Sequence, residues 1–419
     1  MSKVLDIDLY QATMLRAYFH AGKHEEIGAM EVFARKLPDS RNFFVVVGLA
    51  RILDYLDSLK FDYRDIEILT SIPGLQIDPN NIKDYRFIDY LKTIKFREQI
   101  TVWAMLEGTV AFPYEPLLRL EGPIALLQYV EKHILSIINH DVRIASKAIR
   151  IVNAARGIPV YDFGGRRAHE ETSPDVARAA YIAGFAGTSN VAAFAEYGVP
   201  VAGTMGHVWV MSHDSEKEAF ENWNKAFRKS TYLIDTYDVN NGFLNALEAS
   251  EDIGAIRLDS GDMVSQSIKF HGDICNKKAQ IKIMASNDLN EYKIDDMLRS
   301  GAKIDMFGVG TELVATPDSP SLGFVYKLVA RKIGNDWVPV HKNSEGKATY
   351  GGRKQVYRKE KRDLVSTTNP EESGLLFKIS DCYEFDLNNC RIRVNDQLNN
   401  LPNNLLELDK VNYEVVVGE

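Results

Sequence analysis

Short apolar runs alternate with helix-like segments between residues 158 and 309, and this alternation restricts the fold more than any other feature of the chain. The runs lie at 158–163, 181–186, 199–204, 253–258, 281–285 and 304–309. Strands that alternate with helices pair in a parallel sheet, because each helix returns the chain to the same end of the sheet. The sequence therefore predicts an α/β fold with a β/α barrel.

Every predicted strand is followed by small, polar or ionisable residues. These endings are Asp162, Gly187 to Asn190, His207, Asp259 to Asp262, Ser286 to Asp288 and Gly308 to Thr311. In a β/α barrel the chemistry gathers at the carboxyl ends of the strands. We therefore expect these residues to meet at one mouth of the barrel.

The chain is long enough for roughly two or three domains. Residues 1–121 mix helical and strand-like patterns, which predicts an N-terminal α+β domain. Residues 122–330 open with a long helical stretch and contain the predicted barrel. Residues 331–419 read as a smaller, polar and strand-rich C-terminal segment that packs on the first two domains.

Charge and cysteine content restrict the partners and the compartment. The 50 basic and 58 acidic residues give a formal net charge of −8, so we expect no general nucleic-acid surface. Cys275, Cys382 and Cys390 lack the paired spacing of a zinc site or a disulfide framework, which indicates a cytoplasmic protein. The longest apolar run, 43–50, is too short to cross a bilayer, so we expect no membrane partner.

His207 is the first candidate for chemistry. It follows the apolar run that ends at Thr204, where an imidazole would be presented to a ligand. Its neighbours Met205 and Val208 are equally compatible with a histidine that is satisfied inside the core. The residues alone leave both interpretations open.

Two arginine positions suggest that an anion is bound. Arg166 lies beside Arg167 near a predicted helix start, where cations oppose the helix dipole unless an anion lies between them. The alternative is a solvated helix start. Arg257 precedes Asp259 and Asp262, a combination that suits a magnesium-bridged pyrophosphate, with an internal ion pair as the alternative.

The motifs taken together resemble the nicotinate phosphoribosyltransferase family along most of the chain. In chain order they are Asp8 to Met14, Glu107 to Pro123, Asp162 to His169, Gly187 to Val191, Gly203 to His207, Arg257 to Asp262, Ala285 to Leu289 and Phe307 to Leu313. The resemblance implies a type II phosphoribosyltransferase with an N-terminal α+β domain, an incomplete α/β barrel and a homodimer that shares its active sites.

The implied reaction transfers phosphoribosyl from phosphoribosyl pyrophosphate to the ring nitrogen of nicotinate, with magnesium and coupled hydrolysis of ATP. By the same resemblance, His207 is the histidine that ATP phosphorylates. Phe163 is implied to stack on the pyridine opposite Tyr10 from the partner subunit. Arg166 and Arg257 are implied to hold phosphate, pyrophosphate or carboxylate.

The resemblance also assigns the remaining candidates. The further substrate-binding residues are Thr204, Gly308, Gly310 and Thr311, and the two glycines are implied to bind the 5′-phosphate. Backbone N–H groups after these glycines could cradle a phosphate. Because negative charge grows on the leaving pyrophosphate, magnesium should face it, and Asp259, also a catalytic candidate, and Asp262 are our candidates for organising the metal. Ser189 replaces an aspartate of the related nicotinamide enzymes, and a neutral side chain there favours nicotinate.

The chain departs from the family pattern beside the candidate histidine. Gly206 and Val208 stand where alanine and serine are usual, and we expect the missing hydroxyl to affect how His207 is oriented and hence ATP coupling. The alternative functions are nicotinamide or quinolinate phosphoribosyl transfer, or a phosphosugar- or nucleotide-binding homologue without catalytic activity.

Overall fold

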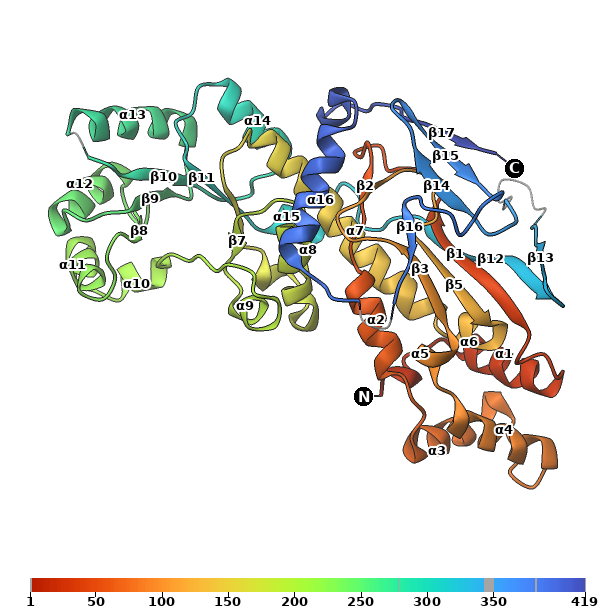
Figure 1. The fold of residues 1–419 in the computed structure, drawn as a ribbon. Helices are drawn as coiled ribbons and strands as arrows, with labels where there is room; N and C mark the ends of the chain where they lie inside the picture. The colour runs from red at the N-terminus through yellow and green to blue at the C-terminus, as the bar shows by residue number, and fades with distance from the viewer. Residues whose placement is uncertain (1, 278, 343–349, 381–382, 419) are drawn as a thin grey trace. The chain divides into compact units, whose positions relative to one another are not determined.

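The computed structural model describes residues 2–277, 279–342, 350–380 and 383–418, so Cys382 lies outside the described residues. The chain forms two compact units (Figure 1). The first unit contains Met1–Arg143, Ser321–Leu405 and Lys410–Glu419, and the second contains Ile144–Pro320 and Leu406–Asp409. These units do not coincide with the predicted division at 121 and 330, because most of the C-terminal segment joins the N-terminal residues.

The second unit is built on a parallel six-stranded sheet in the order β7-β6-β11-β10-β9-β8. Its strands are β6 (Val160–Asp162), β7 (Gly187–Thr188), β8 (Thr231–Leu233), β9 (Ala255–Leu258), β10 (Lys282–Ala285) and β11 (Met306–Val309). The sheet has two edges, β7 and β8, and is therefore not a closed barrel. The expected incomplete β/α barrel is confirmed.

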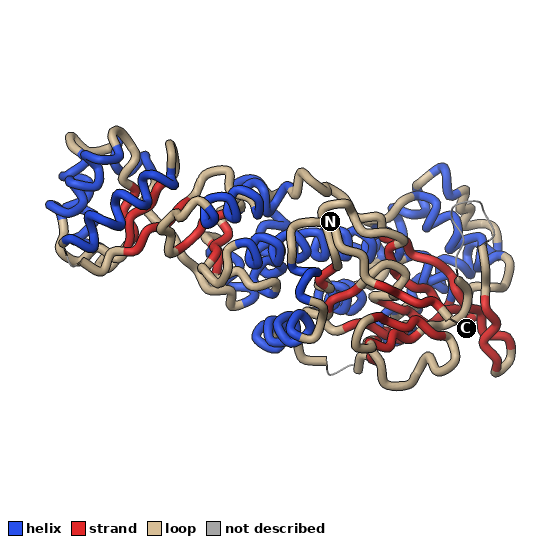
Figure 2. Tube along the Cα trace, turned by 90° about the horizontal axis from the view of Figure 1, so that it is seen from above, coloured by secondary structure: helices blue, strands red, loops and turns tan. Residues whose placement is uncertain are grey.

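Helices connect and surround these strands, as Figure 2 shows in blue around red. They are α8 (Ser173–Ile182), α9 (Val191–Tyr197), α10 (His207–Met211), α11 (Glu216–Ala226), α12 (Val239–Ala249), α13 (Met263–Asn276), α14 (Glu291–Arg299) and α15 (Thr311–Ala315). Several begin at a polar residue that follows a strand. The side chains of Asn190, Asp238, Asp262 and Asn290 each accept a hydrogen bond from the backbone of the helix they precede.

Two of the predicted strands are wrong and one strand was missed. The apolar run at 181–186 contains the last turn of α8, and the strand β7 begins only at Gly187. The run at 199–204 contributes a single parallel bridge, from Val201 to Thr188. Strand β8 was missed because its apolar run is short and follows the polar residues Arg228 to Ser230.

The first unit contains a six-stranded sheet in the order β13-β12-β1-β5-β3-β16, a three-stranded sheet, β14-β15-β17, and a two-stranded sheet, β2-β4. The strands are β1 (Ile27–Ala34), β2 (Phe44–Val45), β3 (Thr101–Met105), β4 (Val110–Ala111), β5 (Leu118–Pro123), β12 (Phe324–Ile333), β13 (Asp336–Pro339), β14 (Gln355–Arg358), β15 (Arg362–Ser366), β16 (Leu376–Lys378) and β17 (Glu414–Val417). Strand β12 pairs antiparallel with β1, so the C-terminal segment completes the N-terminal sheet.

The helices of the first unit pack on these sheets around one large apolar core. They are α1 (Leu9–His20), α2 (Leu49–Ser58), α3 (Tyr63–Ser71), α4 (Ile82–Thr93), α5 (Phe96–Gln99) and α6 (Ile124–Tyr129), while α7 (Glu131–Ala154) runs through both units. Helix α16 (Leu387–Asn399) also belongs to the first unit. Buried Lys354 of the C-terminal segment pairs with buried Glu31 of β1 at 2.8 Å. None of the helices in the described part of the chain combines the length and apolar character needed to cross a bilayer.

Candidate active site

Most of the candidate residues belong to the second unit. They lie at or near the carboxyl ends of β6, β8, β9, β10 and β11. The parallel ladder continues past the last strand residues, because Ser286 N donates to Leu258 O at 2.9 Å and Phe163 N donates to Val309 O at 2.8 Å. Side chains that follow neighbouring strands are therefore held at one edge of the sheet.

Arg257 is the centre of a hydrogen-bond network at this edge. Its Nε donates to Ser286 Oγ at 2.8 Å, and one terminal nitrogen donates to Thr204 Oγ1 at 3.0 Å. The other terminal nitrogen donates to Asp259 Oδ1 at 2.7 Å. The structure thus brings Thr204, Arg257 and Asp259 together, and the proposed internal ion pair does exist. Three of the five guanidinium N–H groups are used, so one N–H remains on each terminal nitrogen.

The ring of Phe163 packs against the backbone of β11. A Cβ atom placed on Gly308 would lie 2.6 Å from two ring carbons of Phe163, so this glycine provides the space that the ring occupies. The guanidinium carbon of Arg257 lies 5.5 Å from the ring centroid. A flat aromatic surface and an arginine therefore adjoin each other at the strand ends.

Asp162 fixes the chain on either side of Phe163. Its buried carboxylate accepts from Gly164 N at 2.7 Å and from Thr188 Oγ1 at 2.8 Å. Burial raises the pKa of Asp162 above its ordinary value, and these two hydrogen bonds act in the opposite direction. The side chain therefore ties the turn after β6 to the end of β7, where the backbone of Ser189 also donates to Asp162 O.

His207 is the first residue of the short helix α10, not the end of a strand. Its Nδ1 lies 3.1 Å from Thr236 Oγ1, and its Nε2 lies 3.8 Å from Asp259 Oδ2. The side chain is 42% exposed, so the alternative of a satisfied core histidine is wrong. Val208 is 77% exposed and a Cβ on Gly206 would meet no atom within 4 Å.

Two residues of this site, Asp235 and Thr236, were missing from the sequence-based candidates. Asp235 and Thr236 follow β8, the strand that was missed. The run Thr231 to Ile234 followed by Asp235 was the signal available, and it matches the pattern used for the other strands. Ser286 was recognised as a strand ending, but its hydrogen bond with Arg257 depends on the register between β10 and β9.

The carboxylates at this edge have different environments. Asp235 Oδ2 accepts from Asp259 N at 2.9 Å and from Ser260 Oγ at 2.7 Å, while its buried Oδ1 has no hydrogen-bond partner among the described residues. Asp262 is exposed and caps α13, and its hydrogen bonds from Ser265 lower the pKa of its carboxyl.

These carboxylates do not form a closed metal site. Within the described residues, no three or more His, Cys, Asp or Glu side chains are arranged to hold a metal ion. Magnesium is commonly held by one or two carboxylates together with phosphate oxygens of a substrate. The free Oδ1 of Asp235 and the Oδ2 of Asp259 fit that second arrangement, and the exposed carboxylate of Asp262 also caps α13.

The remaining candidates are more exposed. Arg166 lies in a 3₁₀ turn (Gly165–Arg167) after β6 and makes no hydrogen bond or ion pair with another described residue. Ser189 and Thr311 are also exposed, and Gly310 precedes α15. Tyr10 belongs to α1 of the first unit, where it is 45% exposed and its hydroxyl donates to Glu131 Oε2 at 3.3 Å.

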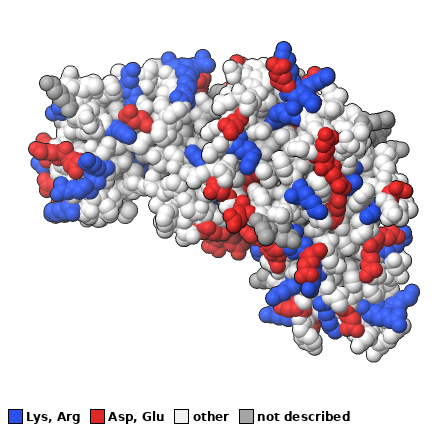
Figure 3. Space-filling model, viewed as in Figure 1, with Lys and Arg blue, Asp and Glu red and all other residues white. Residues whose placement is uncertain are grey.

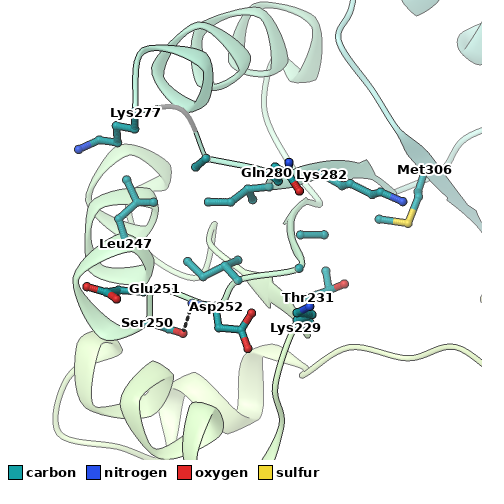
Figure 4. A pocket seen from close by; sticks show the side chains of 15 residues that line it. Lys229, Thr231, Leu247, Ser250, Glu251, Asp252, Lys277, Gln280, Lys282 and Met306 are labelled. Carbon is teal, nitrogen blue, oxygen red and sulfur yellow. Dashed lines mark hydrogen bonds between the residues drawn. The ribbon is translucent and has the colours of Figure 1, made fainter.

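A large cavity of about 860 Å³ lies elsewhere, at the amino ends of β8, β9 and β10 (Figure 4). Its lysines do not converge, because Lys277 extends away from the cavity and Lys282 extends toward Met306. On the face shown in Figure 3, the described basic and acidic side chains are interspersed. The chemistry-bearing groups converge at the carboxyl ends of the strands instead.

Two family models match the chain. Residues 5–139 match the nicotinate phosphoribosyltransferase N-terminal domain, and residues 158–368 match the nicotinate phosphoribosyltransferase family. The structure is similar to human nicotinic acid phosphoribosyltransferase, with a TM-score of 0.82 at 24% identity over 98% of this chain and 97% of that one. It also resembles a nicotinate-nucleotide pyrophosphorylase from Pyrococcus furiosus, with a TM-score of 0.74 at 25% identity over 95% of each chain.

Curated relatives belong to the same family. Nicotinate phosphoribosyltransferase pncB2 from Mycobacterium tuberculosis is 40% identical over 361 residues, which cover 84% of this chain and 74% of that protein. The nicotinate phosphoribosyltransferase of Bacillus subtilis is 37% identical over 382 residues, covering 88% of this chain and 75% of the relative. The chain belongs to the nicotinate phosphoribosyltransferase family.

Proposed function

We propose that this protein transfers the phosphoribosyl group of phosphoribosyl pyrophosphate to the ring nitrogen of nicotinate, in the NAD salvage route of the cytoplasm. The observation that carries the proposal is the Arg257 network beside the Phe163 ring at the strand ends. The bond between C1 of the ribose and the pyrophosphate oxygen breaks with its electron pair on pyrophosphate. The nitrogen lone pair forms the new C1–N bond, which gives nicotinate mononucleotide.

The anion-binding side of the site would be Arg257, together with the exposed Arg166. Negative charge grows on the leaving pyrophosphate in the transition state, and fixed donors aimed at it lower the barrier. The two unused N–H groups of Arg257 are held in place by a partly buried network and are suited to a phosphate or carboxylate. Magnesium, held by Asp235 and Asp259 with phosphate oxygens, would neutralise more of that charge.

The pyridine would stack on Phe163. An aromatic surface positions the ring nitrogen without making a hydrogen bond to it. Gly308 and Gly310 would bind the 5′-phosphate with Thr311, whose backbone begins α15. The neutral, exposed Ser189 does not repel the carboxylate of nicotinate, which favours this pyridine over nicotinamide.

We propose that ATP hydrolysis is coupled through phosphorylation of His207. A ring nitrogen attacks the γ-phosphorus, an N–P bond forms, and the bond to the bridging oxygen breaks to release ADP. The proposal is supported by the exposure of the imidazole and by its place between Thr236 and Asp259. Thr236 supplies a hydroxyl contact that the chain lacks at Val208, so the departure from the family pattern has a local substitute.

We also propose a homodimer in which Tyr10 of one subunit contributes to the site of the other. Several large apolar side chains near the strand ends are exposed: Val191 71%, Phe194 57%, Val208 77% and Met211 64%. Exposed apolar side chains such as these suit burial against a second copy.

The reaction is tested by incubating the purified protein with phosphoribosyl pyrophosphate, magnesium, ATP and one of three pyridines. We expect nicotinate to give mononucleotide and pyrophosphate with a kcat/KM at least about 100-fold above nicotinamide and quinolinate. The measurement is product formation by mass spectrometry. Binding of phosphoribosyl pyrophosphate without product would favour the alternative of a non-catalytic phosphosugar-binding homologue, and a preference for another pyridine would contradict the substrate assignment.

Gly308→Ala should impair the stacking surface. The new methyl group would overlap the Phe163 ring and force it to move, so we expect kcat/KM for nicotinate to fall about 10-fold. Gly272→Ala is the control, because a Cβ there meets no atom within 4 Å and the residue lies in α13. Equal nicotinate kinetics in Gly308→Ala and wild type would argue against stacking on Phe163.

His207→Ala should abolish the stimulation by ATP while phosphoribosyl transfer without ATP stays within about 3-fold of wild type. The readouts are initial rates with and without ATP and the phosphate label retained by the protein. Gly206→Ala and Val208→Ser restore the usual family residues at open or exposed positions, so ATP stimulation should stay within about 2-fold. ATP stimulation that survives His207→Ala would show that the assignment is wrong.

A further inference from the structure

Ser286 occupies a position between the two charged groups of the site. It directly follows β10 and is 2% exposed, and its backbone N–H continues the parallel ladder by donating to Leu258 O at 2.9 Å. The residue can therefore neither turn toward solvent nor shift along the sheet. Its hydroxyl lies next to both Arg257 and Asp259, which come from the neighbouring strand β9 and the residue just after it.

The hydrogen atoms in this arrangement can be assigned. Arg257 Nε has only a donor, so the Ser286 oxygen must accept that bond. The single hydroxyl hydrogen of Ser286 is then available for an acceptor, and Asp259 Oδ1 lies within hydrogen-bond distance, with Leu258 O at 3.3 Å as the other candidate. The Ser286 hydroxyl thus connects the Arg257 cation to the Asp259 anion, because its oxygen accepts from one and its hydrogen can be donated to the other.

This bridge complements the direct ion pair. Arg257 and Asp259 already contact each other at 2.7 Å, but one contact leaves the guanidinium plane free to rotate. The Ser286 contact at Nε and the Thr204 contact at a terminal nitrogen together fix that plane. Asp259 Oδ1 is also occupied twice, by Arg257 and Ser286, which leaves Oδ2 on the side of His207.

We infer that Ser286 is a positioning residue that fixes the orientation of Arg257 for phosphoribosyl transfer. The inference rests on the proposed function, and it assigns to Ser286 no contact with the substrate. Its effect passes through Arg257, so the two unused N–H groups of the guanidinium keep their direction only while the Ser286 hydroxyl is present.

A double-mutant cycle tests this inference. We expect Ser286→Ala to lower kcat/KM about 10-fold, with a higher KM for whichever substrate shows a higher KM in Arg257→Lys. In the Arg257→Lys background, Ser286→Ala should change kcat/KM by less than about 2-fold, because the group it orients is absent. A merely structural role would lower activity equally in both backgrounds.

The control variant is Ser267→Ala, which removes a fully buried serine of α13 that makes two hydrogen bonds away from the site. Its kinetics should match those of wild type. If Ser286→Ala melts well below Ser267→Ala, Ser286→Cys repeats the test with a side chain of similar shape and weaker hydrogen bonds.

Equal 10-fold losses in the two backgrounds, or no loss in the wild-type background, would overturn the inference. Failure of the proposed function is recognised separately, because the wild-type protein would then form no mononucleotide. In that case the same cycle is measured as pyrophosphate affinity by calorimetry instead of kcat/KM. The four proteins are wild type, Ser286→Ala, Arg257→Lys and the double variant. Coupling between Ser286 and Arg257 in pyrophosphate affinity would support the inference, and additive effects would contradict it.

Discussion

The parallel pairing of β6, β9, β10 and β11 is the constraint on which the rest of the site depends. Hydrogen bonds between these strands continue one residue beyond the strands themselves, at Phe163 and Ser286. Side chains from three different strands are therefore fixed before any substrate arrives. The Arg257 network, the Phe163 surface and the Asp259 carboxylate all derive their positions from this ladder. The absence of a side chain at Gly308 then allows the aromatic ring to lie directly on the sheet edge.

Polar residues after the strands divide between two physical tasks. Asn190, Asp262 and Asn290 satisfy backbone N–H groups at the starts of α9, α13 and α14. Arg257 and Asp259 instead contact each other and neighbouring strand ends, which leaves donor and acceptor groups available for a ligand. Residue type alone does not separate these tasks, since an aspartate serves in both. Position separates these tasks, because a carboxylate one residue before a helix has its oxygens next to the unpaired backbone N–H groups of the first helical turn.

The sequence predicted the fold class and the clustering of strand ends because alternating apolar runs and helical segments report directly on a parallel sheet. It failed where local pattern and tertiary structure disagree. The apolar residues 181–186 are equally suited to the buried face of a helix, and α8 ends among them. His207 was expected at the end of a strand and instead begins α10. Asp235 was missed because the short apolar run that forms β8 was not recognised as a strand, and the contacts of Ser286 depend on strand register, which the sequence pattern does not specify.

The central claim is that nicotinate and the phosphoribosyl group meet at the carboxyl ends of the parallel strands. A crystal structure of the protein with nicotinate mononucleotide tests this most directly. The account predicts the pyridine stacked on Phe163, the 5′-phosphate at Gly308 and Gly310, and at least one anionic oxygen within hydrogen-bond distance of an Arg257 N–H group. Mononucleotide bound at the amino ends of β8, β9 and β10, in the cavity lined by Lys229 and Lys282, would contradict it.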